Sequence, residues 1–106
     1  MISEDRVENA VEFLRDTSKR YGVARGHVAF YEGNLRRVKA LEMVGRPGSA
    51  ADREATAYAS SAYLEALEGL QNAVADCETL RAQRDAAEMT IEVWRSQFSA
   101  SKRGNI

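Results

Sequence analysis

Two groups of basic and aromatic side chains in this 106-residue sequence could bind nucleic acid. Arginine and lysine neutralise phosphates, and aromatic rings stack on bases. A structural interpretation competes with this one: aromatic residues can close the end of a helical core, and terminal basic residues can offset a helix dipole. The candidate residues are Arg25, Arg36, Arg37 and Lys39 in the first group, and Trp94, Arg95, Phe98, Lys102 and Arg103 in the second.

Nucleophilic and metal chemistry have few candidate residues. The chain holds one cysteine, Cys77, and one histidine, His27, so zinc has no ligand set at the required spacing. If the chain reverses at Pro47, His27 faces roughly residue 67, about 15 Å along the helix from Cys77. Cys77 also lies in an apolar stripe, where cysteine usually behaves as a small buried hydrophobe. We therefore predict no catalytic residue, no metal and no cofactor, and a protein that is not an enzyme.

Composition favours long helices. Net charge is −1 and charged residues make up 29% of the chain, which argues against both a strongly basic nucleic-acid binder and an acidic tail. Alanine, glutamate, arginine and leucine are abundant, as in coiled coils. A single cysteine suits a reducing, cytoplasmic location. The charged N-terminus does not resemble a signal peptide, and no apolar run reaches the roughly 20 residues needed to cross a membrane.

A heptad pattern predicts a first helix over about residues 4–44. Ser3 is a suitable N-cap for it. Gly22 leaves two alternatives open, because it could end a first helix or lie within a continuous one. The seam residues are Val7, Leu14, Tyr21, Val28 and Leu35, interleaved with Ala10/Val11, Thr17, Ala24, Tyr31 and Val38.

Gly45-Arg46-Pro47-Gly48 is the strong break in the pattern, and it predicts a turn over 45–49. Ser49 then caps a second helix, with Asp52 as its capping-box-like partner. That helix extends over about 50–99 and is either continuous or broken near Ser60, and a flexible tail follows over 100–106. Its apolar stripe comprises Tyr63, Ala66/Leu67, Leu70, Ala73/Val74, Cys77, Leu80, Ala87, Ile91, Trp94 and Phe98, with Arg84 interrupting it.

These elements predict one all-α domain over 1–106, a long antiparallel helical hairpin that resembles a coiled coil. A lone hairpin buries one stripe per helix, so we expect a homo-oligomer, a dimer that forms a four-helix bundle. A row of small residues lies away from the seam. It is either a second contact face, where another helix approaches, or a solvent face. The row comprises Gly22, Gly26, Ala29, Gly33 and Ala40.

The stretch Glu78-Thr-Leu-Arg-Ala-Gln-Arg-Asp-Ala-Ala-Glu-Met-Thr-Ile-Glu-Val-Trp-Arg-Ser-Gln97, preceded by Tyr63-Leu-Glu-Ala-Leu-Glu-Gly-Leu70, carries a resemblance. It resembles small all-helical hypothetical proteins of bacteriophages and prophages, some of which are encoded near single-strand annealing recombination genes. The resemblance implies a phage accessory protein in the cytoplasm of a bacterial host, and it carries no catalytic motif.

Two functional hypotheses follow. The first is a non-enzymatic interaction protein that binds a partner protein in phage DNA recombination or assembly. The alternative is a weak single-stranded nucleic-acid-binding protein that uses the basic and aromatic groups.

Overall fold

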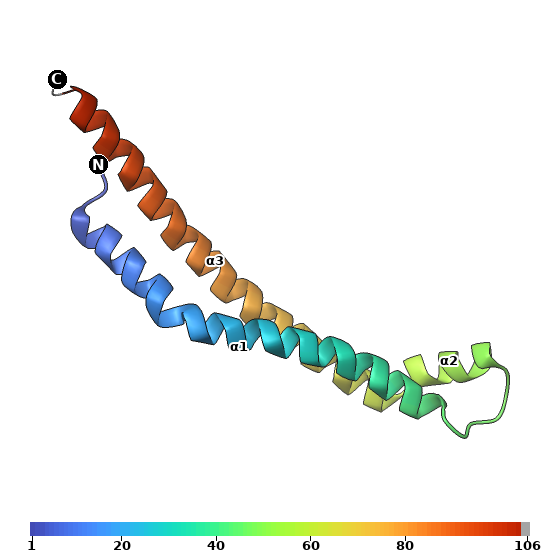
Figure 1. Ribbon diagram of the computed structural model, residues 1–106. Helices are drawn as coiled ribbons and strands as arrows, with labels where there is room; N and C mark the ends of the chain where they lie inside the picture. The colour runs from blue at the N-terminus through green and yellow to red at the C-terminus, as the bar shows by residue number, and fades with distance from the viewer. Residues whose placement is uncertain (105–106) are drawn as a thin grey trace. The chain divides into compact units, whose positions relative to one another are not determined.

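The computed structural model describes residues 1–104, and over this range the chain forms three α-helices and no β-strand (Figure 1). The helices are α1 (Glu4–Met43), α2 (Ala50–Tyr58) and α3 (Ser61–Gly104). The all-α class and the long helical hairpin are therefore confirmed. None of the helices in this range has an apolar stretch long enough to cross a membrane.

The chain divides into two compact units, which are described separately here. The first unit comprises Met1–Gly22 and the chain from Glu78 onward, and the second comprises Val23–Cys77. Both α1 and α3 contribute residues to each unit. The single domain expected over 1–106 stays a prediction.

In the first unit, the start of α1 lies antiparallel to the C-terminal part of α3. The backbone N–H of Ile2 donates a hydrogen bond to Oε1 of Gln97 at 2.8 Å. Further along, Arg81 Nε donates to the hydroxyl oxygen of Tyr21 at 3.0 Å. As the residue number rises along α1 it falls along α3, which is the register of an antiparallel pair.

Arg84 occupies a seam position in the first unit. Its Nη1 atom donates to the backbone oxygen of Leu14 and to Oγ1 of Thr17, each at 2.7 Å. The guanidinium carbon also lies 5.2 Å from the centroid of the Tyr21 ring, within cation–π range. Arg84 thus binds a carbonyl, a hydroxyl and an aromatic face.

In the second unit, the Tyr31 ring of α1 lies against Gly69 of α3. A Cβ atom at Gly69 would lie 3.0 Å from Cε1 of this ring, so the ring would have to shift for any larger residue. Residue 50 lies midway in the sequence between Tyr31 and Gly69, so the antiparallel pairing is centred there rather than on Pro47. The register predicted from a reversal at Pro47 was therefore wrong, and His27 faces about residue 73 instead of residue 67. The reason is that α2 is part of the connection.

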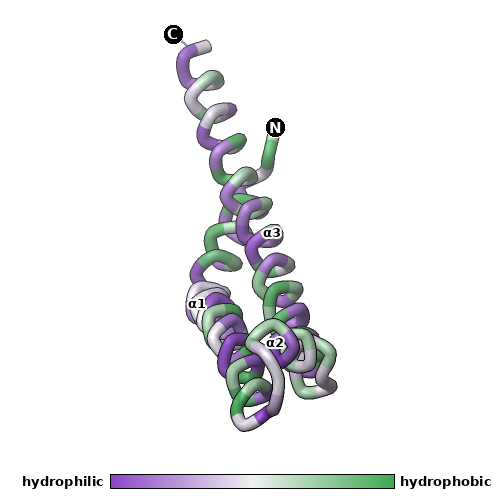
Figure 2. The backbone as a smooth tube through the Cα atoms, turned by 90° about the vertical axis from the view of Figure 1, so that its right-hand side faces the viewer, coloured by the Kyte–Doolittle hydropathy of each residue, from purple (hydrophilic) through white to green (hydrophobic). Residues whose placement is uncertain are grey.

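The seam of both helices follows the heptad pattern, with small residues innermost. Every seam residue of α1 named above is buried or half-buried except Val11, one of the two alternatives at its position. Where the sequence offers a small and a larger apolar residue side by side, alanine is the buried one. Ala66 and Ala73 are buried, whereas Leu67 and Val74 are 44% and 39% exposed. Hydrophobic and hydrophilic residues consequently intermingle along α1 and α3 (Figure 2).

Capping explains where α1 begins and ends. Ser3 Oγ accepts a hydrogen bond from the backbone N–H of Arg6, and Glu4 and Asp5 lie in the first turn. α1 continues through Gly22, so the continuous alternative is the observed one. After its last residue the chain turns through Gly45 and Gly48, whose φ angles of 73° and 107° lie in the region that favours glycine.

The second predicted helix is broken near Ser60 into α2 and α3, which is one of the two alternatives that the sequence left open. Ser49 Oγ accepts from the backbone N–H of Asp52 at 3.1 Å and caps α2. Ser60 Oγ accepts from the backbone N–H of Tyr63 at 3.1 Å and caps α3, while it also donates to the backbone oxygen of Ala57 at 2.7 Å. One serine therefore closes α2 and opens α3.

The end of α3 differs from the expected boundary. The sequence predicts a helix end near residue 99 and a flexible tail over 100–106, but α3 continues to Gly104. Residues 100–103 contain no helix breaker, and Lys102 and Arg103 lie in the last turn, where basic side chains stabilise the helix dipole. The part of the predicted tail at 105–106 lies outside the described residues.

Candidate interaction surface

The face of α1 that points away from the seam changes character along the helix. In the second unit this face consists of small and apolar residues and two arginines, with no acidic residue among them. We call it the outward face of α1, and it comprises Val23, Gly26, Ala29, Phe30, Gly33, Arg36, Arg37 and Ala40. Gly22, which also belongs to the predicted row of small residues, lies in the first unit.

The glycines of this row have open space around them. A Cβ atom added at Gly22, Gly26 or Gly33 would meet nothing within 4 Å. None of the three has a positive φ, because over residues 1–104 the glycines with a positive φ are Gly45 and Gly48. Neither packing within the chain nor backbone conformation therefore requires glycine at these positions.

Phe30 is the residue of this face that the sequence analysis missed. Its side chain is 64% exposed, and its ring contacts Tyr31 edge-on at a centroid distance of 5.3 Å. The helical spacing offered a signal, because Phe30 lies seven residues after the exposed Val23 and beside Ala29 and Gly33. Next to the ring is a shallow hollow of about 450 Å³, lined by Ala29, Phe30, Gly33, Asn34 and Arg37.

The first basic group does not act as one cluster. Arg36 and Arg37 are exposed on the outward face. Lys39 instead points to α2, where its Nζ lies 3.1 Å from Oε1 of Glu54 and 4.8 Å from the centroid of the Tyr58 ring. Arg25 is exposed. Of this group, Arg36 and Arg37 are the members that lie next to each other on the outward face of α1.

The contacts of Lys39 shift two pKa values in opposite directions. Hydrogen bonding with Tyr58 and then with Glu54 raises the pKa of Lys39 above its ordinary value. Hydrogen bonding with Lys39 and then with Tyr58 lowers the pKa of Glu54 below its ordinary value. Both shifts favour the charged forms, so this ion pair fastens α2 to α1 at neutral pH.

The second basic and aromatic group lies near the end of α3, in the first unit. Trp94 is half-buried and stacks on Phe98 with a centroid distance of 5.3 Å and an interplanar angle of 20°. Lys102 Nζ lies 5.7 Å from the Phe98 ring, which is 45% exposed. Arg95 forms an ion pair with Glu92 at 3.0 Å, and Arg103 is exposed. Phe98 and Lys102 thus offer a ring and a charge to solvent.

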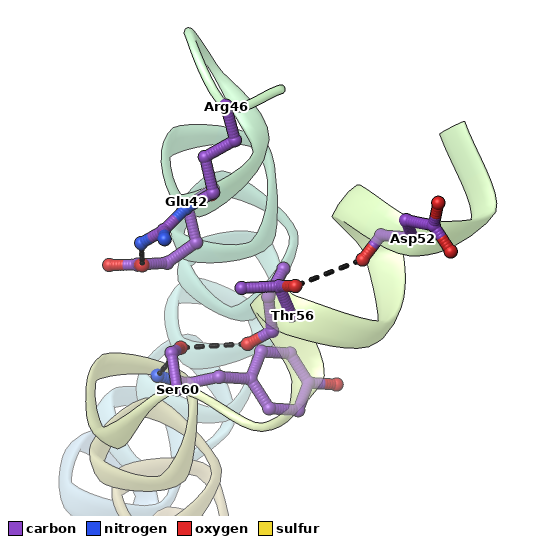
Figure 3. Close-up of polar contacts among 7 residues, drawn as sticks. Glu42, Arg46, Asp52, Thr56 and Ser60 are labelled. Atoms are coloured by element: carbon purple, nitrogen blue, oxygen red, sulfur yellow. Dashed lines mark hydrogen bonds and ion pairs between the residues drawn. The ribbon is translucent and has the colours of Figure 1, made fainter. Parts of the chain in front are cut away.

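A polar cleft of about 590 Å³ lies between the end of α1, α2 and the start of α3 (Figure 3). Its polar groups are occupied by local contacts. Arg46 Nη2 pairs with Oε2 of Glu42 at 2.7 Å, and its Nε donates to the backbone oxygen of the same residue. Thr56 Oγ1 donates to the backbone oxygen of Asp52 at 3.0 Å, and Ser60 serves as the double cap described above. The Thr56 hydroxyl thus bonds within α2, and the Ser60 hydroxyl bonds at the junction of α2 and α3.

Cys77 and His27 are not brought together. Cys77 is 3% exposed within the seam, whereas His27 is exposed at the side of α1. Across residues 1–104, no three histidine, cysteine or acidic side chains gather in a group that could hold a metal ion.

The comparisons with known proteins are negative. No protein family matches this chain, and neither a curated protein nor a solved structure does. The surfaces described above therefore have to be interpreted from their own chemistry.

That chemistry is suited to contact with another macromolecule. The outward face of α1 combines an exposed aromatic ring, small residues and two cations. Aromatic side chains and arginine are the residues that most often dominate binding energy in protein interfaces.

Proposed function

We propose that this protein is a non-enzymatic interaction protein that associates with itself and acts by binding a partner protein. The observation that carries the proposal is the division of apolar residues in the seam. Ala66 and Ala73 are buried, while the larger Leu67 and Val74 beside them remain exposed. Apolar side chains that are exposed together on one surface mark a site for contact with another chain.

We further propose that the protein is phage-encoded and works in the cytoplasm of a bacterial host, in DNA recombination or assembly. The resemblance of the C-terminal half to small helical phage proteins supports this setting. Affinity capture of the tagged protein from infected or lysogenic cells tests it. The proposal predicts co-purification of a recombination or assembly protein, and recovery of the tagged chain alone would count against it.

A second candidate function is weak binding of single-stranded nucleic acid. The exposed Phe98 ring with Lys102 above it favours this alternative, because stacking platforms and cations together bind single strands. Fluorescence anisotropy with a labelled oligonucleotide at low and high salt distinguishes nucleic-acid binding from a role that depends on protein contacts alone. Binding that weakens as salt rises supports the alternative. If wild type and Phe98→Ala show equally little binding at low salt, the alternative is wrong.

A further inference from the structure

α3 carries a second apolar stripe besides its seam. Steps of three and four residues place the members of this stripe on one side of the helix, and its three large apolar residues are exposed. All charged residues of α3 over 61–77, the part of the helix in the second unit, are acidic. A partner for this stripe should therefore be both apolar and basic. We call it the acidic stripe of α3, and it comprises Leu64, Leu67, Glu68, Gln71 and Val74.

One side of α1 in the same unit has the opposite charge. Phe30 and Leu41 are exposed large apolar residues, and Asn34 and the exposed Arg37 lie between them at helical spacing. All charged residues over 33–41 are basic. We call this side the basic stripe of α1, and it comprises Phe30, Asn34, Arg37 and Leu41.

The chain does not pair these opposite charges internally. The ion pairs over residues 1–104 include neither Arg37 nor Glu68. In the antiparallel pairing centred on residue 50, Arg37 is level with about residue 63, and Glu68 is level with Glu32, which is also acidic. The complementarity of the two stripes therefore remains available to another copy of the chain.

We infer that the acidic stripe of α3 binds the basic stripe of α1 from a second copy, with the two helices antiparallel. In this register apolar residues meet apolar residues at both ends, two amides meet between them, and a cation meets an anion. This inference rests on the proposed self-association and names its two surfaces. The register pairs Phe30 with Val74, Asn34 with Gln71, Arg37 with Glu68, and Leu41 with Leu64.

Charge decides the direction of the two helices. If they were parallel, with Phe30 opposite Leu64, Arg37 would lie opposite Gln71 and the stripes would form no ion pair between them. The antiparallel register places Arg37 opposite Glu68 and keeps apolar contacts at both ends. Opposite charges across an interface fix its register in this way.

Reversal of one charge at a time tests the contact. Arg37→Glu and Glu68→Arg each place like charges opposite one another, and each should raise the dissociation constant of the full chain about tenfold, as measured by sedimentation equilibrium. An equimolar mixture of the two variants sets opposite charges together again and should restore association. The double variant Arg37→Glu/Glu68→Arg should restore it as well, which a loss of folding could not do.

Asp76→Arg is the matched control, because it makes the same charge change on an exposed residue of α3 in the same unit. Asp76 follows Leu67 by nine residues and so lies on the opposite side of the helix. It should leave the dissociation constant unchanged. Association that is indifferent to both charge reversals, or that the mixture does not restore, overturns the two stripes but leaves self-association standing. A wild type that stays monomeric up to its solubility limit overturns both.

A cross-link gives an independent readout of the direction. When Leu41→Cys and Leu64→Cys copies are mixed under mild oxidation, they should form a disulfide between copies, detected as a mixed species by mass spectrometry. Leu41→Cys mixed with Val74→Cys should not, since only parallel helices would bring those positions together. The native Cys77 is buried and should not interfere. Equal cross-linking of the two mixtures would contradict the antiparallel register.

Discussion

At the scale of single residues, Arg84 is the clearest departure from a simple seam. Heptad seams favour apolar side chains, and an arginine within one can set the register, pair with an acidic residue or extend its charged end to solvent. It is half-buried and donates to the Leu14 carbonyl and the Thr17 hydroxyl. Both groups also have partners within α1, since the Leu14 carbonyl accepts from Ser18 Oγ and Thr17 Oγ1 donates to the Phe13 carbonyl. Arg84 therefore adds hydrogen bonds that join α3 to α1.

Arg84→Ala should therefore lower the free energy of unfolding by about 1.5–3 kcal/mol, the range for hydrogen bonds to a charged group. Urea denaturation followed by circular dichroism measures this. Arg95→Ala is the comparison, because its ion pair with Glu92 is exposed and should contribute under about 0.5 kcal/mol. Equal losses for the two variants would show that Arg84 has no special role in the seam.

At the scale of elements, sequence patterns located the helices better than their pairing. The heptads and the serine caps at Ser3 and Ser49 depend on neighbouring residues, so they were visible in the sequence. The register was not, because it depends on how α2 packs, which involves contacts between distant residues such as the burial of Ala57 and the pair of Lys39 with Glu54. Phe30 was overlooked for a similar reason, because its exposure and the hollow beside it depend on the folded structure.

The docking of α2 should depend on pH through Lys39 and Glu54. The pKa of Glu54 is lowered by folding, so its contribution is present above the ordinary value of 4.5 and lost as pH falls through the lower folded value. The pKa of Lys39 is raised, so its contribution is present below 10.5 and lost as pH rises through the higher folded value.

Amide chemical shifts of α2 residues, followed by NMR from pH 3 to pH 7, would reveal the acidic transition. Glu54→Gln should abolish that transition and leave α2 more weakly docked at neutral pH. A transition of the same size in the variant would assign it to another carboxylate.

Two glycines in helices should respond oppositely to alanine. Gly22→Ala meets open space and should stabilise the protein by about 0.5–1 kcal/mol through helix propensity. Gly69→Ala brings a Cβ atom to 3.0 Å from the Tyr31 ring, so the ring must move and the gain should be lost or reversed. Thermal unfolding of both variants at one protein concentration makes the comparison. A similar gain at both positions would mean that Tyr31 shifts freely.

At the scale of the whole molecule, stability should be linked to self-association. A species that dimerises when folded gains stability from mass action, so its Tm depends on concentration. We expect the Tm of the wild type to rise by roughly 2–6 °C for each tenfold increase in concentration. Calorimetry over two decades of concentration measures this. A Tm of the wild type that does not change with concentration would contradict self-association.

The hydrogen bond from Ile2 to Gln97 has a consequence for synthesis on the ribosome. It joins residues 95 positions apart, whereas Lys39 and Glu54 are only 15 apart. The nascent chain can form the contacts around α2 early, but the first turns of α1 meet their partner only after residue 97 has been synthesised. Until then the start of α1 is exposed to chaperones and proteases without its partner in α3, and a chain whose synthesis stalls near residue 80 should be readily degraded.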